Sequence, residues 1–268
     1  MSRIISIVNQ NYGVGKTTTS LNLGHALGYL GKKTLIIDLD PQSTMSNNFG
    51  LKSRDVKFNL FDCFVKNINI KDLLLKTKLK NIDLIPSNID LITAEIELIN
   101  KPEREEFLKK NIKTLENNYD YIIIDTPPSL GLLTVNALTC SHSIITPIEC
   151  EYFALEGLGK LFNVVKIIQS RLNPSLIIDG LLLTKFDTRL RLSSQVVDDT
   201  KSHFQDLVFE NIIYKNNKIK EASDNLTSII NYDINSRAAQ NFINLAKELD
   251  DRIHAKLSKE EKTDFLEA

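Results

Sequence analysis

Residues 3–18 read RIISIVNQNYGVGKTT, and this stretch decides the fold. It begins with a short apolar run of isoleucine and valine. Gly13 and Gly15 then form a turn, and Lys16 and Thr17 open a helical pattern that runs to residue 30. This order of strand, glycine turn and helix is typical of a phosphate-binding loop, because the glycines let backbone N–H groups turn inward and the helix dipole attracts anions. The stretch therefore predicts an α/β fold with a phosphate site after its first strand.

The residues of this loop have distinct predicted roles. Lys16 would reach the β- and γ-phosphates of a nucleotide, and the Thr17 hydroxyl would ligate Mg²⁺. The predicted nucleotide-binding residues of the loop are Asn11, Tyr12, Gly13, Val14, Gly15, Lys16, Thr17 and Thr18. A dinucleotide loop is rejected because the turn reads Gly-x-Gly-x-x-Thr and lacks the third glycine that close helix packing needs. An incidental glycine turn is the other alternative, and it is disfavoured because Gly-Lys-Thr in this position is specific.

Further along the chain, short runs of Ile, Leu and Val alternate with helical patterns. Predicted strands cover residues 3–9, 34–38, 82–86, 121–125, 143–147, 177–184 and 207–212. Predicted helices cover residues 17–30, 89–100, 104–117, 130–140, 155–171, 192–203 and 236–257. Continuous apolar strands are buried on both faces, and repeated strand–helix–strand units have right-handed crossovers. We therefore expect a doubly wound, mostly parallel sheet flanked by helices, of the P-loop NTPase type.

Two acidic motifs follow predicted strands. Asp38 and Asp40 end the second strand, and Asp125 ends the run at residues 121–125. Ligands of open α/β sheets bind at this carboxyl edge, so we expect the three carboxylates to converge on the loop. Asp40 would orient the attacking water, Asp125 would hold Mg²⁺ through water, and Asp38 would support the metal or Lys16. The predicted catalytic residues are Lys16, Asp40 and Asp125, and the predicted metal residues are Thr17, Asp38 and Asp125. The alternative for a lone carboxylate is a helix cap.

Composition limits the class of protein. The chain has 268 residues, of which 42% are hydrophobic and 25% charged, which excludes a disordered chain. We expect one P-loop domain over residues 1–257 and a charged tail over residues 258–268. The formal net charge is −1, so DNA contact would need a local cationic patch. Cys63, Cys140 and Cys150 lack metal or disulfide spacing, and no apolar run could span a bilayer. We therefore expect buried thiols and a cytoplasmic protein.

With these motifs the chain resembles the ParA/Soj family of chromosome and plasmid partitioning ATPases, which have a deviant Walker A loop and are related to MinD. The resemblance runs from Ile4 to about Leu249 and includes the loop, the two aspartate motifs and the segments at residues 84–88, 151–157, 221–222 and 236–239. The resemblance implies an ATPase that converts ATP to ADP and phosphate with Mg²⁺. It also implies an ATP-dependent homodimer, non-specific DNA binding at the nucleoid and a ParB-type centromere-binding partner. Longer members carry an N-terminal helix-turn-helix, and this chain resembles the short form.

The loop departs from the family pattern at two positions. The family reads Lys-Gly-Gly-x-Gly-Lys-Thr, and here Asn11 replaces the first lysine and Tyr12 the first glycine. In the family that lysine acts across the dimer on the phosphates of the partner, and such cations are worth about 10³ to 10⁵ in rate. We therefore hypothesise that dimerisation or hydrolysis is weakened. In the alternative, Lys32, Lys33 or another cation replaces the lost charge.

Two later segments are candidates for the nucleotide base. Lys185 and Asp187, in Leu-Thr-Lys-Phe-Asp, weakly echo an Asn-Lys-x-Asp base-reading motif, although a strand-end cap is equally compatible. Tyr214 and Lys215 align with the Pro-Arg-Asn-x-Arg loop of the family. These four residues complete the predicted nucleotide-binding set.

A cationic cluster is the candidate DNA surface. Its predicted DNA-binding residues are Arg189, Arg191, Lys215, Lys218 and Lys220. The resemblance places Arg189 and Lys218 at DNA-binding positions of the family, and such a cluster contacts phosphates without reading bases. The alternative is an ordinary solvated face.

The sequence also bears on three other functions. A nucleotide-dependent binding module without efficient hydrolysis is compatible with Asn11 and Tyr12. A MinD-like membrane switch is disfavoured, because acids surround the apolar residues of the C-terminal tail and would be repelled by anionic lipid, so we expect no stable membrane anchor. An iron–sulfur protein lacks a convincing set of cysteine ligands.

Overall fold

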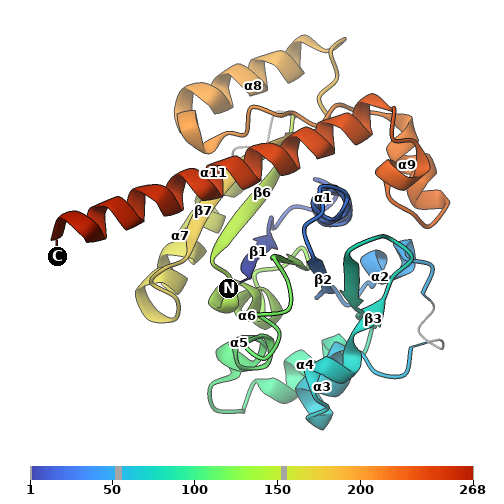
Figure 1. Ribbon diagram of the computed structural model, residues 1–268, viewed down its shortest axis with the longest axis vertical. Coiled ribbons are helices and arrows are strands. Elements are labelled where there is room, and N and C mark those ends of the chain that lie inside the picture. Colours follow the sequence, from blue (N-terminus) through green and yellow to red (C-terminus); the bar gives the residue numbers. More distant parts are fainter. Residues whose placement is uncertain (1, 52–55, 152–155, 268) are drawn as a thin grey trace.

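The computed structural model describes residues 2–51, 56–151 and 156–267. In these residues a sheet lies at the centre of the molecule (Figure 1). It has seven strands, in the order β3-β4-β2-β5-β1-β6-β7. The strands are β1 (Arg3–Ile7), β2 (Thr34–Asp38), β3 (Leu75–Lys76), β4 (Ile82–Ile85), β5 (Tyr121–Asp125), β6 (Ser143–Glu149) and β7 (Ile177–Thr184). All neighbours pair in parallel except β3 and β4. The predicted doubly wound, mostly parallel sheet is confirmed.

The register of the central strands positions the acidic residues. Every residue of β2 and β5 is buried, as expected for apolar strands in a parallel sheet. Asp38 pairs with Asp125 in the β2–β5 register, and Ile7 pairs with Asp125 in the β1–β5 register. Asp38, Asp125 and the end of β1 therefore meet at one edge of the sheet, next to the loop that leads into α1.

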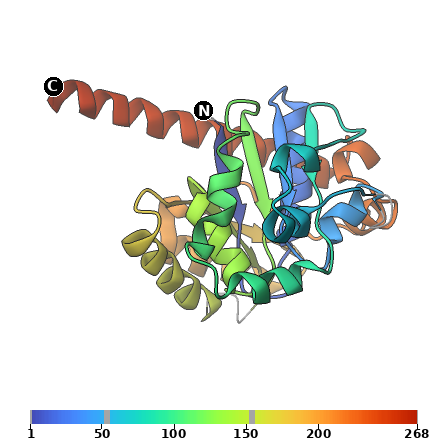
Figure 2. The same ribbon diagram turned by 90° about the horizontal axis from the view of Figure 1, so that it is seen from below.

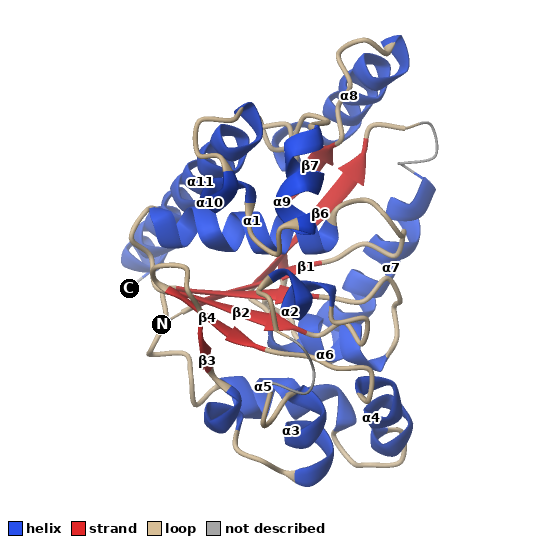
Figure 3. Ribbon diagram, turned by 90° about the vertical axis from the view of Figure 1, so that its right-hand side faces the viewer, coloured by secondary structure: helices blue, strands red, loops and turns tan. Residues whose placement is uncertain are grey.

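Helices cover both faces of the sheet (Figure 3). One face packs against α1 (Lys16–Tyr29), α9 (Asn217–Asp224), α10 (Ile229–Tyr232) and α11 (Arg237–Glu267). The other face packs against α3 (Leu60–Lys66), α4 (Leu91–Leu98), α5 (Phe107–Ile112), α6 (Leu132–Cys140) and α7 (Glu156–Arg171). Along β5, Ile123 contributes to the first core and Ile122 and Ile124 to the second. This alternation follows from the two-residue period of a strand.

The remaining helices are short or lie at the ends of the sheet. They are α2 (Thr44–Asn48), α8 (Arg191–Phe204) and the 3-10 helices at Ile70–Leu73, Arg104–Glu106 and Gln205–Leu207. Cys63, Cys140 and Cys150 are buried free thiols, as predicted. No helix in the described part of the chain is long and apolar enough to cross a membrane.

Several sequence predictions need correction. The predicted strand at residues 207–212 is wrong, because the 3-10 helix Gln205–Leu207 occupies its start and the rest makes only an isolated bridge from Val208 to Leu181. Helix α11 continues to Glu267, past the predicted end at residue 257 (Figure 2). The predicted helix at residues 104–117 is a 3-10 turn followed by the shorter α5. The predicted start of a helix at residue 155 lies outside the described residues, as do residues 152–155 of the family motif at residues 151–157.

Side chains of α11 explain why residues 207–212 do not form a regular strand beside β7. Arg252 of α11 donates hydrogen bonds to the carbonyl oxygens of Val208, at 2.7 Å, and Asp206, at 2.9 Å. The Glu248 carboxylate accepts from the backbone N–H groups of Glu210, at 2.8 Å, and Asn211, at 3.0 Å. Side chains of α11 therefore satisfy backbone groups that a regular strand would have paired with β7.

Candidate nucleotide-binding site

The loop at residues 9–15 connects β1 to α1 and is held in place by the neighbouring strands. Gly13 and Gly15 have φ angles of 77° and 95°, which L-residues with side chains rarely adopt. The Asn9 amide donates to the Pro147 carbonyl oxygen at 2.7 Å and accepts from the Asn11 N–H group at 2.9 Å. The Thr184 hydroxyl, at the end of β7, donates to the Val14 carbonyl oxygen at 2.9 Å. The loop is therefore built into the carboxyl edge of the sheet, as predicted.

Lys16 is the central cation of the loop. Its side chain is buried, and its ammonium group donates a hydrogen bond of 2.8 Å to the Asn11 carbonyl oxygen. Burial lowers the pKa of Lys16, whereas the nearby carboxylates of Asp125 and Asp40 raise it. Because α1 begins at Lys16, the ammonium lies at a helix N-terminus, where anions are favoured.

Asp125 supplies a buried carboxylate with one unused oxygen. Its Oδ1 accepts a hydrogen bond of 2.8 Å from the Ser20 hydroxyl, and its Oδ2 is buried without a hydrogen-bond partner in the described part of the chain. Burial raises the pKa of Asp125 to about 7, against the lowering effect of the Thr17 and Ser20 hydroxyls. An orphaned carboxylate oxygen beside a threonine hydroxyl fits Mg²⁺, which commonly uses one or two protein oxygens together with water and phosphate oxygens.

Asp38 has its acceptor oxygens occupied. Its Oδ2 accepts from the Ser46 hydroxyl at 2.6 Å and the Ser46 N–H group at 2.8 Å, and its Oδ1 accepts from the Asp40 N–H group at 3.2 Å. Complete burial, together with the charge of Asp125, raises its pKa to about 8. Asp38 therefore fixes the segment that carries Asp40, and its predicted role as a metal residue stays a prediction.

Asp40 lies in a short segment between β2 and α2. Its carboxylate accepts from the Gln42 N–H group at 2.9 Å, and its carbonyl oxygen accepts from the Ser87 hydroxyl at 2.6 Å. Burial raises the pKa of Asp40, while the charge of Lys16 lowers it. Lys16, Asp40 and Asp125 are thus close enough to shift one another's pKa, and their catalytic roles stay a prediction.

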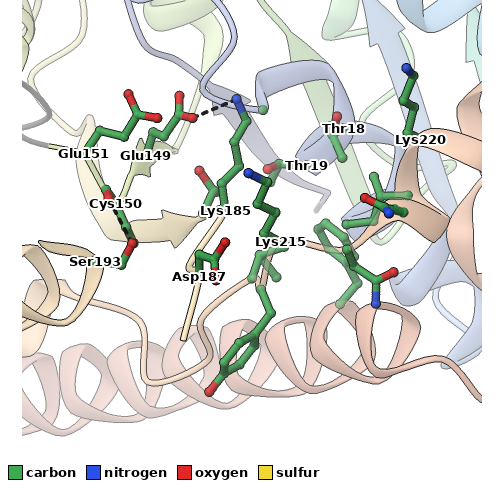
Figure 4. A pocket seen from close by; sticks show the side chains of 18 of the residues that line it. Thr18, Thr19, Glu149, Cys150, Glu151, Lys185, Asp187, Ser193, Lys215 and Lys220 are labelled. Carbon is green, nitrogen blue, oxygen red and sulfur yellow. Dashed lines mark hydrogen bonds and ion pairs between the residues drawn. The ribbon is translucent and has the colours of Figure 1, made fainter. Parts of the chain in front are cut away.

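A pocket of about 510 Å³ opens beside the loop (Figure 4). Its lining includes the predicted residues Gly15, Thr18, Lys185, Asp187, Tyr214, Lys215 and Lys220. Sequence reasoning did not assign Glu149, Cys150, Ser193, Ile219 and Phe242, which also line it. The pocket therefore joins the helix that follows the loop to the two segments that were predicted to hold the base.

Two ion pairs shape the lining. The Lys185 ammonium lies 2.9 Å from the Glu149 carboxylate and 3.9 Å from the position that a Cβ atom on Gly13 would take. Lys185 also has a φ of 54°, which costs a residue with a side chain some backbone strain. Asp187 accepts two side-chain hydrogen bonds from Arg189, at 2.9 and 2.7 Å, and these hold the pKa of Asp187 well below its usual range.

Tyr214 is held by an aromatic contact that the sequence did not indicate. The Arg237 guanidinium stacks 3.4 Å from the centre of its ring, and Phe186 packs edge-on with ring centres 5.3 Å apart. Arg237 lies in the family motif at residues 236–239, which gave a signal for importance without giving a role. The contact ties the start of α11 to the wall of the pocket.

The predicted DNA cluster does not form one free cationic surface. Arg189 pairs with Asp187, and Lys218 pairs with Asp233 at 2.5 Å. Lys215 and Lys220 line the pocket beside the loop, and Arg191 is exposed at the start of α8.

The two positions that depart from the family pattern differ in their surroundings. The Asn11 side chain lies beside Gly157 of α7, 3.2 Å from the position of a Cβ atom there, whereas the Tyr12 side chain is 81% exposed. Lys32 pairs with Asp250 of α11 at 2.8 Å, and Lys33 follows it directly. Both lysines lie beyond the far end of α1, about 20 Å from the loop along a helix of this length, so they do not replace the lost charge within the chain.

A parallel sheet with a phosphate loop between β1 and α1, and buried aspartates at the ends of β2 and β5, defines a P-loop NTPase. The family profile described as an AAA domain matches residues 2–178. The chain belongs to the ParA/Soj family of chromosome-partitioning ATPases. It is 46% identical to the sporulation initiation inhibitor protein Soj of Bacillus subtilis, over 93% of this chain and 98% of that protein. It is 40% identical to the chromosome partitioning protein ParA of Myxococcus xanthus, over 93% and 88% of the two chains.

Solved structures agree with this assignment. A cobyrinic acid a,c-diamide synthase from Mycobacterium smegmatis, with bound ADP and magnesium, superposes with a TM-score of 0.82 and 31% identity, covering 92% of this chain and 93% of that chain. A putative plasmid partition protein from Borrelia burgdorferi, bound to AMPPNP, superposes with a TM-score of 0.77 and 29% identity, covering 96% and 100%.

Proposed function

We propose that this chain binds Mg²⁺-ATP at the loop and hydrolyses it to ADP and phosphate as the switch of a DNA-partitioning system. The observation that carries this proposal is the buried Lys16 ammonium beside Asp40 and Asp125, with one Asp125 oxygen that has no hydrogen-bond partner among the described residues. The related synthase with bound ADP and magnesium supports the choice of ligand. One ammonium, one hydroxyl and inward backbone N–H groups suit a triphosphate.

The residues of the chain divide the reaction among them. Lys16 exchanges the Asn11 carbonyl oxygen for phosphate oxygens and stabilises the charge that develops on them. Thr17 and Asp125 would hold Mg²⁺, which neutralises phosphate charge when bound. Asp40, whose pKa the nearby charge of Lys16 lowers, would orient the attacking water.

The pocket beside the loop would take the nucleoside. It adjoins Thr18 on one side and is walled by Lys185, Asp187, Tyr214 and Lys215 on the other. The bidentate pair with Arg189 fixes the Asp187 carboxylate, and the stacked Arg237 fixes Tyr214. Preorganised walls lower the cost of ordering the ligand.

The proposed role in DNA partitioning rests on the relatives. One is named a sporulation initiation inhibitor protein and another a chromosome partitioning protein, and these names support a role at the nucleoid, in the cytoplasm. We propose non-specific DNA contact through the predicted cluster, an ATP-dependent homodimer and stimulation by a ParB-type partner. Arg191, Lys215 and Lys220 have no ion-pair partner in the described residues and are the cations of that cluster with charge to offer.

Calorimetry with ATP and ADP in the presence of Mg²⁺ tests the proposal. The parent protein should bind both nucleotides, and a Lys16→Ala variant should lose binding. Phosphate release should rise when DNA and the centromere-binding partner are added together. Equal binding by the parent and the variant would overturn the proposal.

A nucleotide-dependent binding module without efficient hydrolysis is the second candidate. Asn11 favours it, because its side chain is a neutral amide where the family has an ammonium. Lys185 opposes it, since its ammonium lies beside Gly13 and can supply charge from the same chain if it leaves its ion pair with Glu149.

Turnover separates these two candidates. If the loop is impaired, an Asn11→Lys/Tyr12→Gly protein should hydrolyse ATP at least 10-fold faster than the parent. Equal turnover, together with a loss on Lys185→Met, would show that the parent is already a competent ATPase. Light scattering with ATP, with ADP and with neither reports dimerisation in the same proteins.

A further inference from the structure

The wall of the nucleotide pocket holds a carboxylate whose acceptor positions are nearly all taken. Asp187 follows the end of β7, is 7% exposed and lines the pocket (Figure 4). Its Oδ1 accepts from the Arg189 backbone N–H group at 3.1 Å and from the Arg189 Nε at 2.9 Å, and its Oδ2 accepts from Nη2 at 2.7 Å. A carboxylate has about four lone-pair sites, so about one is left for a ligand.

Arg189 reaches this carboxylate from the solvent. The Arg189 side chain is 81% exposed, whereas that of Asp187 is 8% exposed. The Leu190 N–H group donates to the Asp187 carbonyl oxygen at 3.0 Å, so the chain turns back at this point. Among the described residues, Asp187 and Leu190 line the pocket and Arg189 does not. The guanidinium therefore covers the carboxylate without itself filling the pocket.

The backbone around Asp187 is fixed by a neighbouring segment. The Phe186 N–H group donates to the Ile213 carbonyl oxygen at 3.1 Å, and the Phe186 carbonyl oxygen accepts from the Lys215 N–H group at 3.0 Å. Tyr214, which lies between these two partners in the chain, packs edge-on against the Phe186 ring. None of these contacts involves Arg189, so the carboxylate should keep its place in the wall when the arginine is removed.

The two purine bases differ in what they offer to a carboxylate. Guanine presents two adjacent donors, N1–H and the 2-amino group, and these match the two oxygens of a free carboxylate. Adenine presents the 6-amino donor beside the N1 acceptor, so a free carboxylate would face a lone pair of the base. A carboxylate that is already bonded to a guanidinium disfavours guanine, since at least one donor of the base would be left unpaired.

We propose that Arg189 is a positioning residue that selects adenine over guanine nucleotides by occupying the Asp187 carboxylate. The inference rests on the proposed binding of ATP and assigns the choice of base to one side chain outside the pocket. Glu149 and Glu151 are the other acids among the described lining residues. Glu149 is already paired with Lys185, so Asp187 is the acid whose release would change the pocket most directly.

Calorimetry of the full chain with ADP and with GDP, both with Mg²⁺, tests the proposal. The parent should bind ADP more tightly than GDP. In Arg189→Ala the ratio of the GDP to the ADP dissociation constant should fall by about 10-fold or more, because the freed carboxylate accepts two charge-assisted hydrogen bonds from guanine. The fall should come from tighter binding of GDP, whereas a merely structural loss would weaken both nucleotides alike.

Further variants and a third nucleotide identify the group responsible. Arg189→Ala/Asp187→Asn should lose the gain for GDP, because the amide no longer offers two acceptor oxygens. IDP, which lacks the 2-amino group, should gain less than GDP in Arg189→Ala. Arg191→Ala removes an exposed arginine at the start of α8 and should keep the ratio of the parent. Lys215 is a second cation whose charge acts on Asp187, so Arg189→Ala/Lys215→Gln covers the case in which that lysine takes the vacated carboxylate.

The contrary results are distinct. An unchanged ratio in both Arg189→Ala and Arg189→Ala/Lys215→Gln would overturn the inference and leave the nucleotide site intact. A gain for GDP that survives Asp187→Asn would overturn it and assign base reading to another acceptor of the wall. Equal affinity of the parent for ADP and GDP would show that the pocket does not select its base. A parent that binds neither nucleotide would overturn the proposed function together with the inference.

Discussion

The Lys16 ammonium donates its hydrogen bond to the Asn11 carbonyl oxygen, 2.8 Å away in the same loop. The buried cation is therefore kept at the helix N-terminus by a neutral acceptor, with the carboxylates of Asp40 and Asp125 near enough to affect its pKa. Such a group is costly to bury, because desolvation opposes its charge.

Lys16→Met should separate the contribution of this cation to ATP binding from its contribution to the stability of the fold. We expect the affinity for ATP to fall at least 100-fold, since two charge-assisted hydrogen bonds are worth about 3 kcal/mol together. Without nucleotide, the free energy of unfolding should fall by about 3 kcal/mol, because the buried carboxylates of Asp40 and Asp125 lose the cation beside them. Calorimetry and urea unfolding measure the two effects. A variant of equal or greater stability would mean that the desolvation of the ammonium outweighs its attraction to the two carboxylates.

Asp187→Asn should strengthen DNA retention if Arg189 contacts DNA. The carboxylate neutralises Arg189 through two hydrogen bonds, at 2.9 and 2.7 Å, and the amide would leave the guanidinium charge free. We expect a 2- to 10-fold higher affinity at low salt and a steeper salt dependence. Filter binding at several salt concentrations measures this. Arg189→Gln is the matched variant, and equal DNA binding by both would remove Arg189 from the DNA surface.

His25 should make stability depend on pH. It is buried in α1 beside the Ser228 hydroxyl, and burial lowers its pKa to about 4. Between pH 6.5 and 4 the unfolded chain binds a proton that the folded chain excludes, so the contribution of His25 is complete above pH 6.5 and is lost as pH falls through that range. The loss should reach about 3 kcal/mol.

Urea unfolding of the parent and His25→Gln at pH 7, 6, 5 and 4 checks this sign. As pH falls, the parent should lose more stability than His25→Gln does. His203→Gln, at an exposed position, should follow the parent. Parallel curves for the parent and His25→Gln would contradict the assignment.

Gly180→Ala should destabilise the edge of the sheet. A Cβ atom on Gly180 of β7 would lie 2.5 Å from the Phe209 ring and 2.9 Å from the Leu207 carbonyl oxygen. Overpacking of this kind costs about 1 to 3 kcal/mol. Gly159→Ala is the control, because nothing lies within 4 Å of that position on α7 and alanine favours a helix. Thermal unfolding should show a lower midpoint for the first variant and an equal or higher one for the second.

Local sequence patterns predicted most of the strands and the placing of the catalytic candidates. The runs that end at Asp38 and Asp125 are apolar throughout, and parallel strands bring their carboxyl ends to one edge. Polar capping side chains were available signals for helices that were missed. Asn59 caps α3, Asn216 caps α9 and Ser228 caps α10 by accepting backbone N–H hydrogen bonds.

Contacts between distant residues account for what the patterns did not predict. Glu149 ends β6 and Lys185 directly follows the neighbouring strand β7. Arg237, at the start of α11, contacts Tyr214 from more than 20 residues further along the chain. The false strand at residues 207–212 has a suitable apolar sequence, but its backbone is satisfied by Arg252 and Glu248, some 40 residues later. Neither periodicity nor spacing reports such partners.

The hold of Arg252 and Glu248 on residues 206–211 has a consequence for how the protein behaves in concentrated solution. β7 is the last strand of the sheet, and an uncovered last strand offers a ready template for strands of other molecules. Two side chains of α11 help to hold the segment that covers β7, together with the backbone hydrogen bond from Phe209 to Leu181, so disruption of that helix should increase aggregation of the purified protein. The solubility of the protein thus depends on α11, the last helix that the structure describes.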